Sequence, residues 1–294
     1  MVNNAAGWAH PDSRMDWLII ALLLGAALLH SSWHAMIKAG DDRLVGLAGM
    51  NVVSAGISMC ALPWVAIPEA RQWPVLAFSV VLHNTYKFGL AQVYKHGELS
   101  QAYPIARGFC PLFSALLALV LLAEIPTGWQ AMGIILISGG ILIMGTENRA
   151  ARPSSPLLIA AAITGFLVAS YTVVDAYGVR LGGDWLSYVI WLMVLDGAAF
   201  VATISVSRGS GFWKTIVAQW RYTLATGILG TVAFCVFLWA LSRGPIGGVS
   251  ALRETSVLFA SLIGVIAMKE RWSAMKFAGV VLIMFGIIAF AWRA

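Results

Sequence analysis

The chain of 294 residues is 60% hydrophobic and only 11% charged, and its formal net charge is +6. Soluble domains contain about 25% charged residues, so the composition excludes a soluble domain and predicts a membrane protein. The positive charges form no basic cluster or aromatic platform, which excludes nucleic acid as a partner.

Ten apolar runs approach or exceed the roughly 20 residues that a helix needs to cross a bilayer. The runs are 17–37, 44–66, 73–94, 101–122, 128–146, 156–178, 185–206, 222–241, 246–268 and 273–292. Tryptophans gather near their ends, as is typical of membrane interfaces. We therefore expect an all-α integral membrane protein with ten transmembrane helices and a retained first helix.

The first run becomes polar in its second half, where His30 and His34 lie four residues apart and share a helix face beside Trp33. A metal site would need further ligands at fixed spacing, and the chain has no HExxH pattern. The three isolated cysteines give no such pattern either. We expect the histidines to face a watery cavity or to form hydrogen bonds within the bundle.

The third run carries His83, Tyr86 and Lys87 at its midpoint, with the i, i+3, i+4 spacing of one helix face. Polar and ionisable groups at the centre of a bilayer are expensive and usually functional. This stripe therefore predicts part of a substrate site.

The fourth run begins with Tyr103 and Pro104 and places Arg107 inside an otherwise apolar segment. An arginine at the centre of a spanning helix costs about 2.5–3.5 kcal/mol on insertion scales, so a cavity wall is the expected location. The alternative is that Arg107 reaches back to the interface and only anchors the helix.

The connection between the third and fourth runs is only about five residues long, which predicts antiparallel neighbours. His83, Tyr86, Tyr103 and Arg107 are then expected to form one face of the substrate cavity. The alternative is an internal hydrogen-bond cluster that holds these two helices together.

The second half of the chain also carries polar groups in its apolar runs. They include Tyr171 and Asp175 in the sixth run, Asp196 in the seventh and Trp239 in the eighth. In the ninth run, Arg253 and Glu254 are adjacent, and we expect them to form a partly self-neutralised pair.

The two halves of the chain resemble each other at an offset of 146 positions. This offset places Arg107 on Arg253, Phe113 on Phe259, Glu124 on Glu270, Gly133 on Gly279 and Gly140 on Gly286. Because each half has an odd number of helices, the two halves must enter the membrane from opposite sides. We expect two inverted five-helix repeats, residues 16–147 and 156–293, around a central cavity.

Three stretches resemble the EamA-type branch of the drug/metabolite transporter superfamily: 30–38 (HSSWHAMIK), 103–107 (YPIAR) and 251–256 (ALRETS), the last followed by Lys269-Glu270-Arg271. The resemblance covers the whole chain and looks closest to the amino-acid exporter group. It implies ten helices in two inverted repeats, with the fifth and tenth as a packing scaffold. The glycines of those two runs are expected to allow that close packing.

The hypothesis favoured by these observations is a secondary transporter that exports small metabolites, most simply amino acids, by alternating access. The predicted substrate-binding residues are His30, Trp33, His83, Tyr86, Lys87, Tyr103, Arg107, Trp239 and Arg253. An arginine or Lys87 could meet a substrate carboxylate, and the tryptophans could pack against its side chain. We expect no catalytic activity, no cofactor and no metal, and a monomer that spans the bacterial inner membrane several times.

Other functions remain open from the sequence. Two arginines also fit a sugar-phosphate carrier, acidic residues fit a lipophilic-cation exporter, and the histidines could serve an intramembrane enzyme. A purely structural subunit would leave the intramembrane charges unexplained. No GxxxxGK[ST] motif is present, so ATP is not expected to drive transport on this chain. Lys and Arg are fewer in the loops on the side that holds both termini, which predicts that the termini lie outside the cell.

Overall fold

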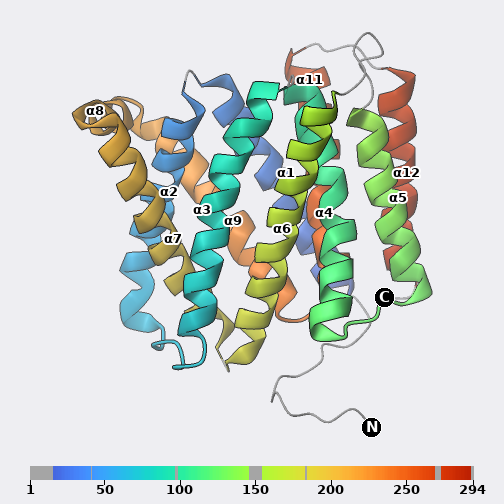
Figure 1. The fold of residues 1–294 in the computed structure, drawn as a ribbon, viewed down its shortest axis with the longest axis horizontal. Coiled ribbons are helices and arrows are strands. Elements are labelled where there is room, and N and C mark those ends of the chain that lie inside the picture. Colours follow the sequence, from blue (N-terminus) through green and yellow to red (C-terminus); the bar gives the residue numbers. More distant parts are fainter. Residues whose placement is uncertain are drawn as a thin grey trace.

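A computed structural model of the chain describes residues 16–40, 42–96, 99–145, 154–182, 184–268 and 273–292. These residues form a bundle of α-helices that run side by side (Figure 1). The helices are α1 (Trp17–Ala39), α2 (Arg43–Ala61), α3 (Trp73–His96), α4 (Leu99–Leu122), α5 (Gly128–Gly145), α6 (Ser155–Leu181), α7 (Trp185–Arg208), α8 (Ser210–Ala218), α9 (Trp220–Leu241), α10 (Ile246–Glu254), α11 (Ser256–Met268) and α12 (Ala274–Ala291), with a 3-10 turn, η1 (Leu62–Trp64), after α2.

Short polar side chains begin several of these helices. Asp42 accepts hydrogen bonds from the backbone N–H groups of Leu44 and Val45 at the start of α2. Asp16, Ser154, Asp184 and Ser273 cap α1, α6, α7 and α12 in the same way. These caps satisfy N–H groups that a helix leaves unpaired in its first turn, and they place polar atoms at the ends of the bundle.

Nine segments of the described chain are long and apolar enough to cross a membrane. The side chains of α3 are described only as far as Gly89, and this part of the helix is not among them. Two further features differ from the ten predicted runs. The ninth run is divided at Thr255 into α10 and α11, and a short helix, α8, precedes the eighth. Nine of the ten predicted runs therefore coincide with apolar helices of the described chain, whereas the interruption and the extra helix were not predicted.

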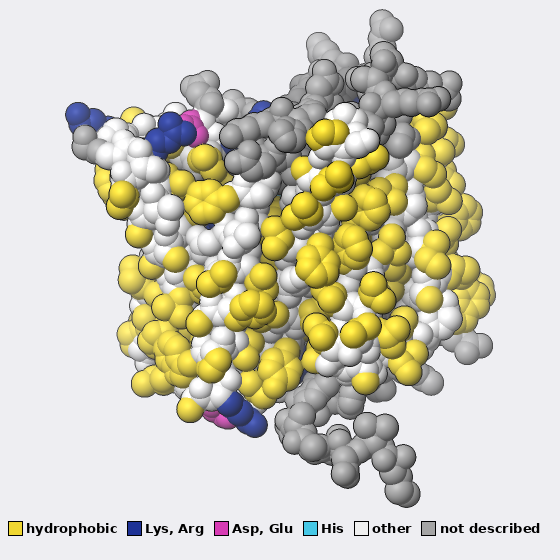
Figure 2. Space-filling model, in the orientation of Figure 1, with side chains coloured by type: hydrophobic (Ala, Val, Ile, Leu, Met, Phe, Trp, Pro, Cys, Tyr) yellow, Lys and Arg dark blue, Asp and Glu magenta, His cyan; other side chains and the backbone are white. Residues whose placement is uncertain are grey.

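The outer surface of the bundle is apolar over its middle part. Figure 2 shows hydrophobic side chains covering this face, with the visible Lys, Arg, Asp and Glu side chains near the upper and lower ends. Many large apolar side chains are exposed there, including Phe78, Val120, Ile135 and Phe285. A soluble protein would bury such a surface, so this belt fits contact with lipid tails.

α5 and α12 pack against each other through glycines at one edge of the bundle (Figure 1). A Cβ atom added at Gly140 would lie 2.6 Å from the carbonyl oxygen of Gly279, and one at Gly133 would lie 3.1 Å from that of Gly286. The two backbones therefore approach closely at two levels. Small residues permit such contact between membrane helices.

The prediction that α3 and α4 pack as direct neighbours is wrong over most of their length. Both helices pack mainly along α6 and touch each other only slightly. The short connection limits the distance between their ends, but it does not prevent a third helix from packing against both. Their polar residues still meet at the cavity, as described next.

Candidate functional site

A cavity lies inside the bundle and is lined by α1, α2, α3, α4, α6, α7, α9 and α10. Seven of the predicted binding residues line it: His30, Trp33, His83, Tyr86, Lys87, Arg107 and Arg253. Helical spacing explains the wall formed by α9, where Gly230, Ala233, Phe234 and Phe237 share one face. The cavity therefore joins helices from both halves of the chain.

The cavity lies near the middle level of the bundle. We call the lower end in Figure 1, where α1 begins and α12 ends, the terminal end. In α1, which begins at this end, the lining residues run from Ala26 to His34, around and beyond the middle of the helix. In α7, which also begins there, they are Leu192, Met193 and Asp196, in the first half of the helix. The cavity therefore extends to both sides of the middle level.

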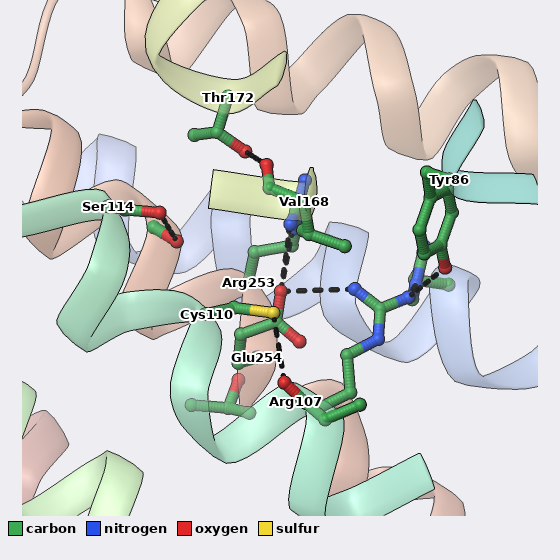
Figure 3. Close-up of polar contacts among 12 residues, drawn as sticks. Tyr86, Arg107, Cys110, Ser114, Val168, Thr172, Arg253 and Glu254 are labelled. Atoms are coloured by element: carbon green, nitrogen blue, oxygen red, sulfur yellow. Dashed lines mark hydrogen bonds and ion pairs between the residues drawn. The ribbon is translucent and has the colours of Figure 1, made fainter. Parts of the chain in front are cut away.

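Arg107 and Arg253 meet at one carboxylate in the cavity wall (Figure 3). Arg107 NH1 donates to Glu254 Oε1 at 3.2 Å, and Arg253 donates to the same oxygen from Nε at 3.0 Å and NH2 at 2.9 Å. Arg107 NH2 also contacts His30 Nε2 at 3.2 Å and Tyr86 OH at 3.4 Å. The expected local pair of Arg253 and Glu254 is therefore shared with an arginine from the other half.

Among the residues that the structure describes, this cluster carries more positive than negative charge. Two guanidinium groups face one carboxylate, and Glu254 is fully buried whereas Arg253 and Arg107 keep 6% and 3% of their surface exposed. Among the described residues, Glu254 Oε2 has no hydrogen-bond partner. The Arg253 guanidinium also lies 4.1 Å from the centre of the Phe237 ring, which supplies a weak cation–π attraction. An anionic group in the cavity would balance the remaining charge.

A second charged pair lies elsewhere on the wall. Lys87 Nζ donates to Asp196 Oδ2 at 2.6 Å and to Asn51 Oδ1 at 3.2 Å. Asn84 donates to the other oxygen of Asp196 at 2.9 Å. This group connects α2, α3 and α7, and its formal charges cancel.

A third cluster lies behind the wall around Asp175, which is completely buried. Its carboxylate accepts hydrogen bonds from Ser79 and from Tyr188 OH, and its Oδ2 lies 2.9 Å from His83 Nε2. The His83 ring stacks on Tyr171 with 4.0 Å between centroids. Asp175 thus fixes the orientation of a histidine that faces the cavity.

The remaining wall is apolar and aromatic. Trp33 stacks on His34 at 3.7 Å between ring centroids and meets His30 edge-on at 4.9 Å. Leu192, Met193 and Phe234 line the cavity as well. Within the described residues, no group of three His, Cys, Asp or Glu side chains could hold a metal ion. The chemistry of this site is therefore that of binding through charge, hydrogen bonds and apolar contact.

A buried ion pair between Arg180 and Glu124 connects helices at the terminal end. Arg180 NH1 lies 3.0 Å from Glu124 Oε2, while its Nε and NH2 donate to the carbonyls of Leu241 at 2.8 Å and Gly244 at 2.7 Å. Glu124 Oε1 accepts the N–H of Ile246. This network connects the ends of α4, α6 and α9 to the start of α10 at the terminal end.

Two predicted site residues are not placed in the cavity. Trp239 does not line it, because it lies two residues after Phe237 and so points from a different face of α9, where its ring packs 5.0 Å from the Arg243 guanidinium. The side chain of Tyr103 and all of Glu270 lie outside the described residues.

The prediction missed several residues that complete the site. Glu254 and Asp196 carry isolated charges in apolar runs, and this signal could have added them to the candidates. Asn51 has no comparable signal, since a single amide among small residues is common in packed helices. Asp175 was visible as a charge, but its position behind His83 depends on the packing of α3 on α6.

Comparison with known proteins agrees with this architecture. A model of the EamA-like transporter family matches residues 17–146 and again 155–292. Among solved structures, 27 chains match; one crystal structure superposes with a TM-score of 0.72 at 17% sequence identity, covering 92% of this chain and 94% of the other. No curated protein matches the chain. Two matched segments that together span most of the chain show that it belongs to the EamA-like transporter family, whose members are membrane transporters of small molecules.

Proposed function

We propose that this protein is a secondary transporter that exports amino acids across the bacterial inner membrane. The observation that carries the proposal is the cluster in which Arg107 and Arg253 share a single carboxylate at the cavity wall. The excess positive charge there suits the carboxylate of a substrate, because guanidinium groups bind carboxylates with paired hydrogen bonds. The substrate side chain would contact the apolar wall around Trp33 and Phe234.

The transport cycle in this proposal is alternating access between two inverted five-helix repeats, residues 16–147 and 156–293. The contacts between α5 and α12 support a symmetric arrangement. Gly133 packs against Gly286 and Gly140 against Gly279, and these are the glycines that the offset of 146 positions exchanges. Arg180 and Glu124 join helices at the terminal end, and in this proposal their contact separates when the cavity opens to that side. We propose that a single copy of the chain carries out the cycle.

A second candidate substrate class is organic phosphates. Two guanidinium groups on the wall would also bind a phosphoryl group, which carries more negative charge than a carboxylate. Glu254 weakens this alternative, because it already neutralises one of the two positive charges. The carboxylate of an amino acid matches the remaining charge more closely.

The test is flux into proteoliposomes, measured with a panel of amino acids, sugar phosphates and lipophilic cations. We expect selective flux of amino acids, and we expect His83→Ala, Tyr86→Phe and Arg107→Gln to reduce it at least about tenfold, which corresponds to about 1.4 kcal/mol. Each variant should remain monodisperse in detergent. Tyr177→Phe and Arg221→Gln, at positions that do not line the cavity, are the matched controls and should transport like the parent.

Three outcomes would contradict the proposal. Selective flux of sugar phosphates would favour the second substrate class, and absence of flux for the whole panel would refute both. If the three cavity variants transported normally, or if all of them failed to fold, the cluster would be a structural hydrogen-bond network rather than a binding site.

A further inference from the structure

The ion pair between Lys87 and Asp196 belongs to the cavity wall and is accessible from inside the cavity. The two side chains keep 10% and 14% of their surface exposed, and both line the cavity. By contrast, Asp175, the other carboxylate on this side of the site, is completely buried. A molecule in the cavity can therefore reach the carboxylate of Asp196 directly.

The surroundings of the Lys87 ammonium are those that recognise any alkylammonium group. The ammonium contacts a carboxylate oxygen of Asp196 at 2.6 Å, the amide oxygen of Asn51 at 3.2 Å and the face of Phe200 at 4.6 Å from the ring centre. An anion, a neutral acceptor and an aromatic face are the three partners that a primary ammonium prefers. Asn84 binds the other oxygen of Asp196 and so holds the carboxylate in place for whichever ammonium occupies the site.

Lysine is the cationic side chain best suited to leave such a site. Its charge is compact and sits on a flexible four-carbon chain, whereas an arginine is held by the fixed geometry of its fork. The two arginines of the cavity are each bound to Glu254, but Lys87 is bound to a different carboxylate. Lys87 can therefore move without disturbing the arginine cluster.

We propose that Asp196 and Asn51 form the binding site for the ammonium group of the substrate, and that Lys87 occupies this site as a tethered substitute when the cavity is empty. The inference rests on the proposed amino-acid transport. An arriving amino acid brings an ammonium to Asp196 and a carboxylate that can pair with the displaced Lys87. Each charge keeps a partner during this exchange, which avoids the large penalty of an unpaired buried charge.

The exchange distinguishes zwitterions from simple amines. An amine without a carboxylate would displace Lys87 and leave its charge unpaired, so it should bind the parent protein weakly. When the charge of Lys87 is removed, the same amine should bind well, because Asp196 then lacks a cation. A lysine that only stabilises the fold gives no such gain.

The experiment uses 2-phenylethylamine, which is phenylalanine without its carboxylate. Its dissociation constant is measured by calorimetry and by thermal stabilisation of the full-length protein in detergent, for the parent, Lys87→Met and Lys87→Gln. We expect both variants to bind it at least about tenfold more tightly than the parent, and the double variant Lys87→Met with Asp196→Asn to lose the gain. Lys214→Met, an exposed lysine of α8, is the matched control and should bind like the parent. The acid 3-phenylpropionate should show no gain in either variant.

The inference is overturned if neither variant gains affinity for the amine, or if the double variant keeps the gain. It is also overturned if neither variant folds even when 2-phenylethylamine is present during purification, because Lys87 is then a structural cation that an added ammonium cannot replace. These results are independent of the flux panel. A gain in amine affinity without amino-acid flux would refute the proposed function alone, and flux without the gain would refute this inference alone.

Discussion

The carboxylate of Glu254 offers the sharpest test of the arginine cluster. Glu254→Gln keeps the size of the side chain and removes its charge, so two guanidinium groups lose their shared counter-ion. The contact of 3.2 Å with Arg107 corresponds to a Coulomb attraction of about 5 kcal/mol at an effective dielectric constant near 20. Removing one partner of a buried pair costs about 3–5 kcal/mol after desolvation is included. We therefore expect the free energy of unfolding to fall by about 3 kcal/mol or more.

The variant should also bind anions more tightly, because Glu254 no longer competes for the guanidinium groups. Unfolding by denaturant in detergent measures the loss of stability, and calorimetry with 3-phenylpropionate measures the affinity, which we expect to rise by about tenfold. Glu69→Gln is the matched control, since Glu69 pairs with Arg71 and both side chains are about half exposed. Its effect should stay below about 1 kcal/mol. If Glu254→Gln were as stable as the parent and bound the acid no better, the charge assigned to this cluster would be wrong.

Three further changes test other parts of the structure. Gly140→Ala should lower the free energy of unfolding by about 1–3 kcal/mol through overpacking. Gly139→Ala should not, because a Cβ added at Gly139 meets no neighbouring atom within 4 Å, and equal effects of the two changes would contradict the packing of α5 on α12. Glu124→Gln should lower the melting temperature, because removing the carboxylate that pairs with the buried Arg180 guanidinium should cost the protein about 3 kcal/mol or more of stability. An unchanged melting temperature would show that the pair does not hold the terminal end together. Trp239→Phe should leave the flux panel unchanged, and altered substrate preference would show that the cavity extends further along α9.

The sequence was sufficient to predict nine spans of the described chain and seven of the residues that line the cavity, because the bilayer imposes strong rules on both. Apolar length locates a span, and an ionisable residue such as Arg107 inside a span needs a polar partner or a cavity. The identity of that partner could not be predicted, since Glu254 lies 147 positions away and meets Arg107 only through the packing of α4 on α10. The break at Thr255 was also hidden. The hydroxyl of Thr255 donates to the carbonyl of Leu252 at 2.6 Å, and threonines make the same local contact inside unbroken helices.

The backbone contact between α5 and α12 has a mechanical consequence for the whole molecule. One helix comes from each segment that the family model matches, and no side chain separates their main chains at Gly140 and Gly279. If one helix slid along the other, each glycine carbonyl would collide with a larger side chain such as Ile137 or Ile283. The two helices can therefore rotate relative to each other more easily than they can slide. In the proposed transport cycle we therefore expect the two segments to turn about this pair, with the largest displacements in the helices farthest from it, α2, α7 and α8 in Figure 1.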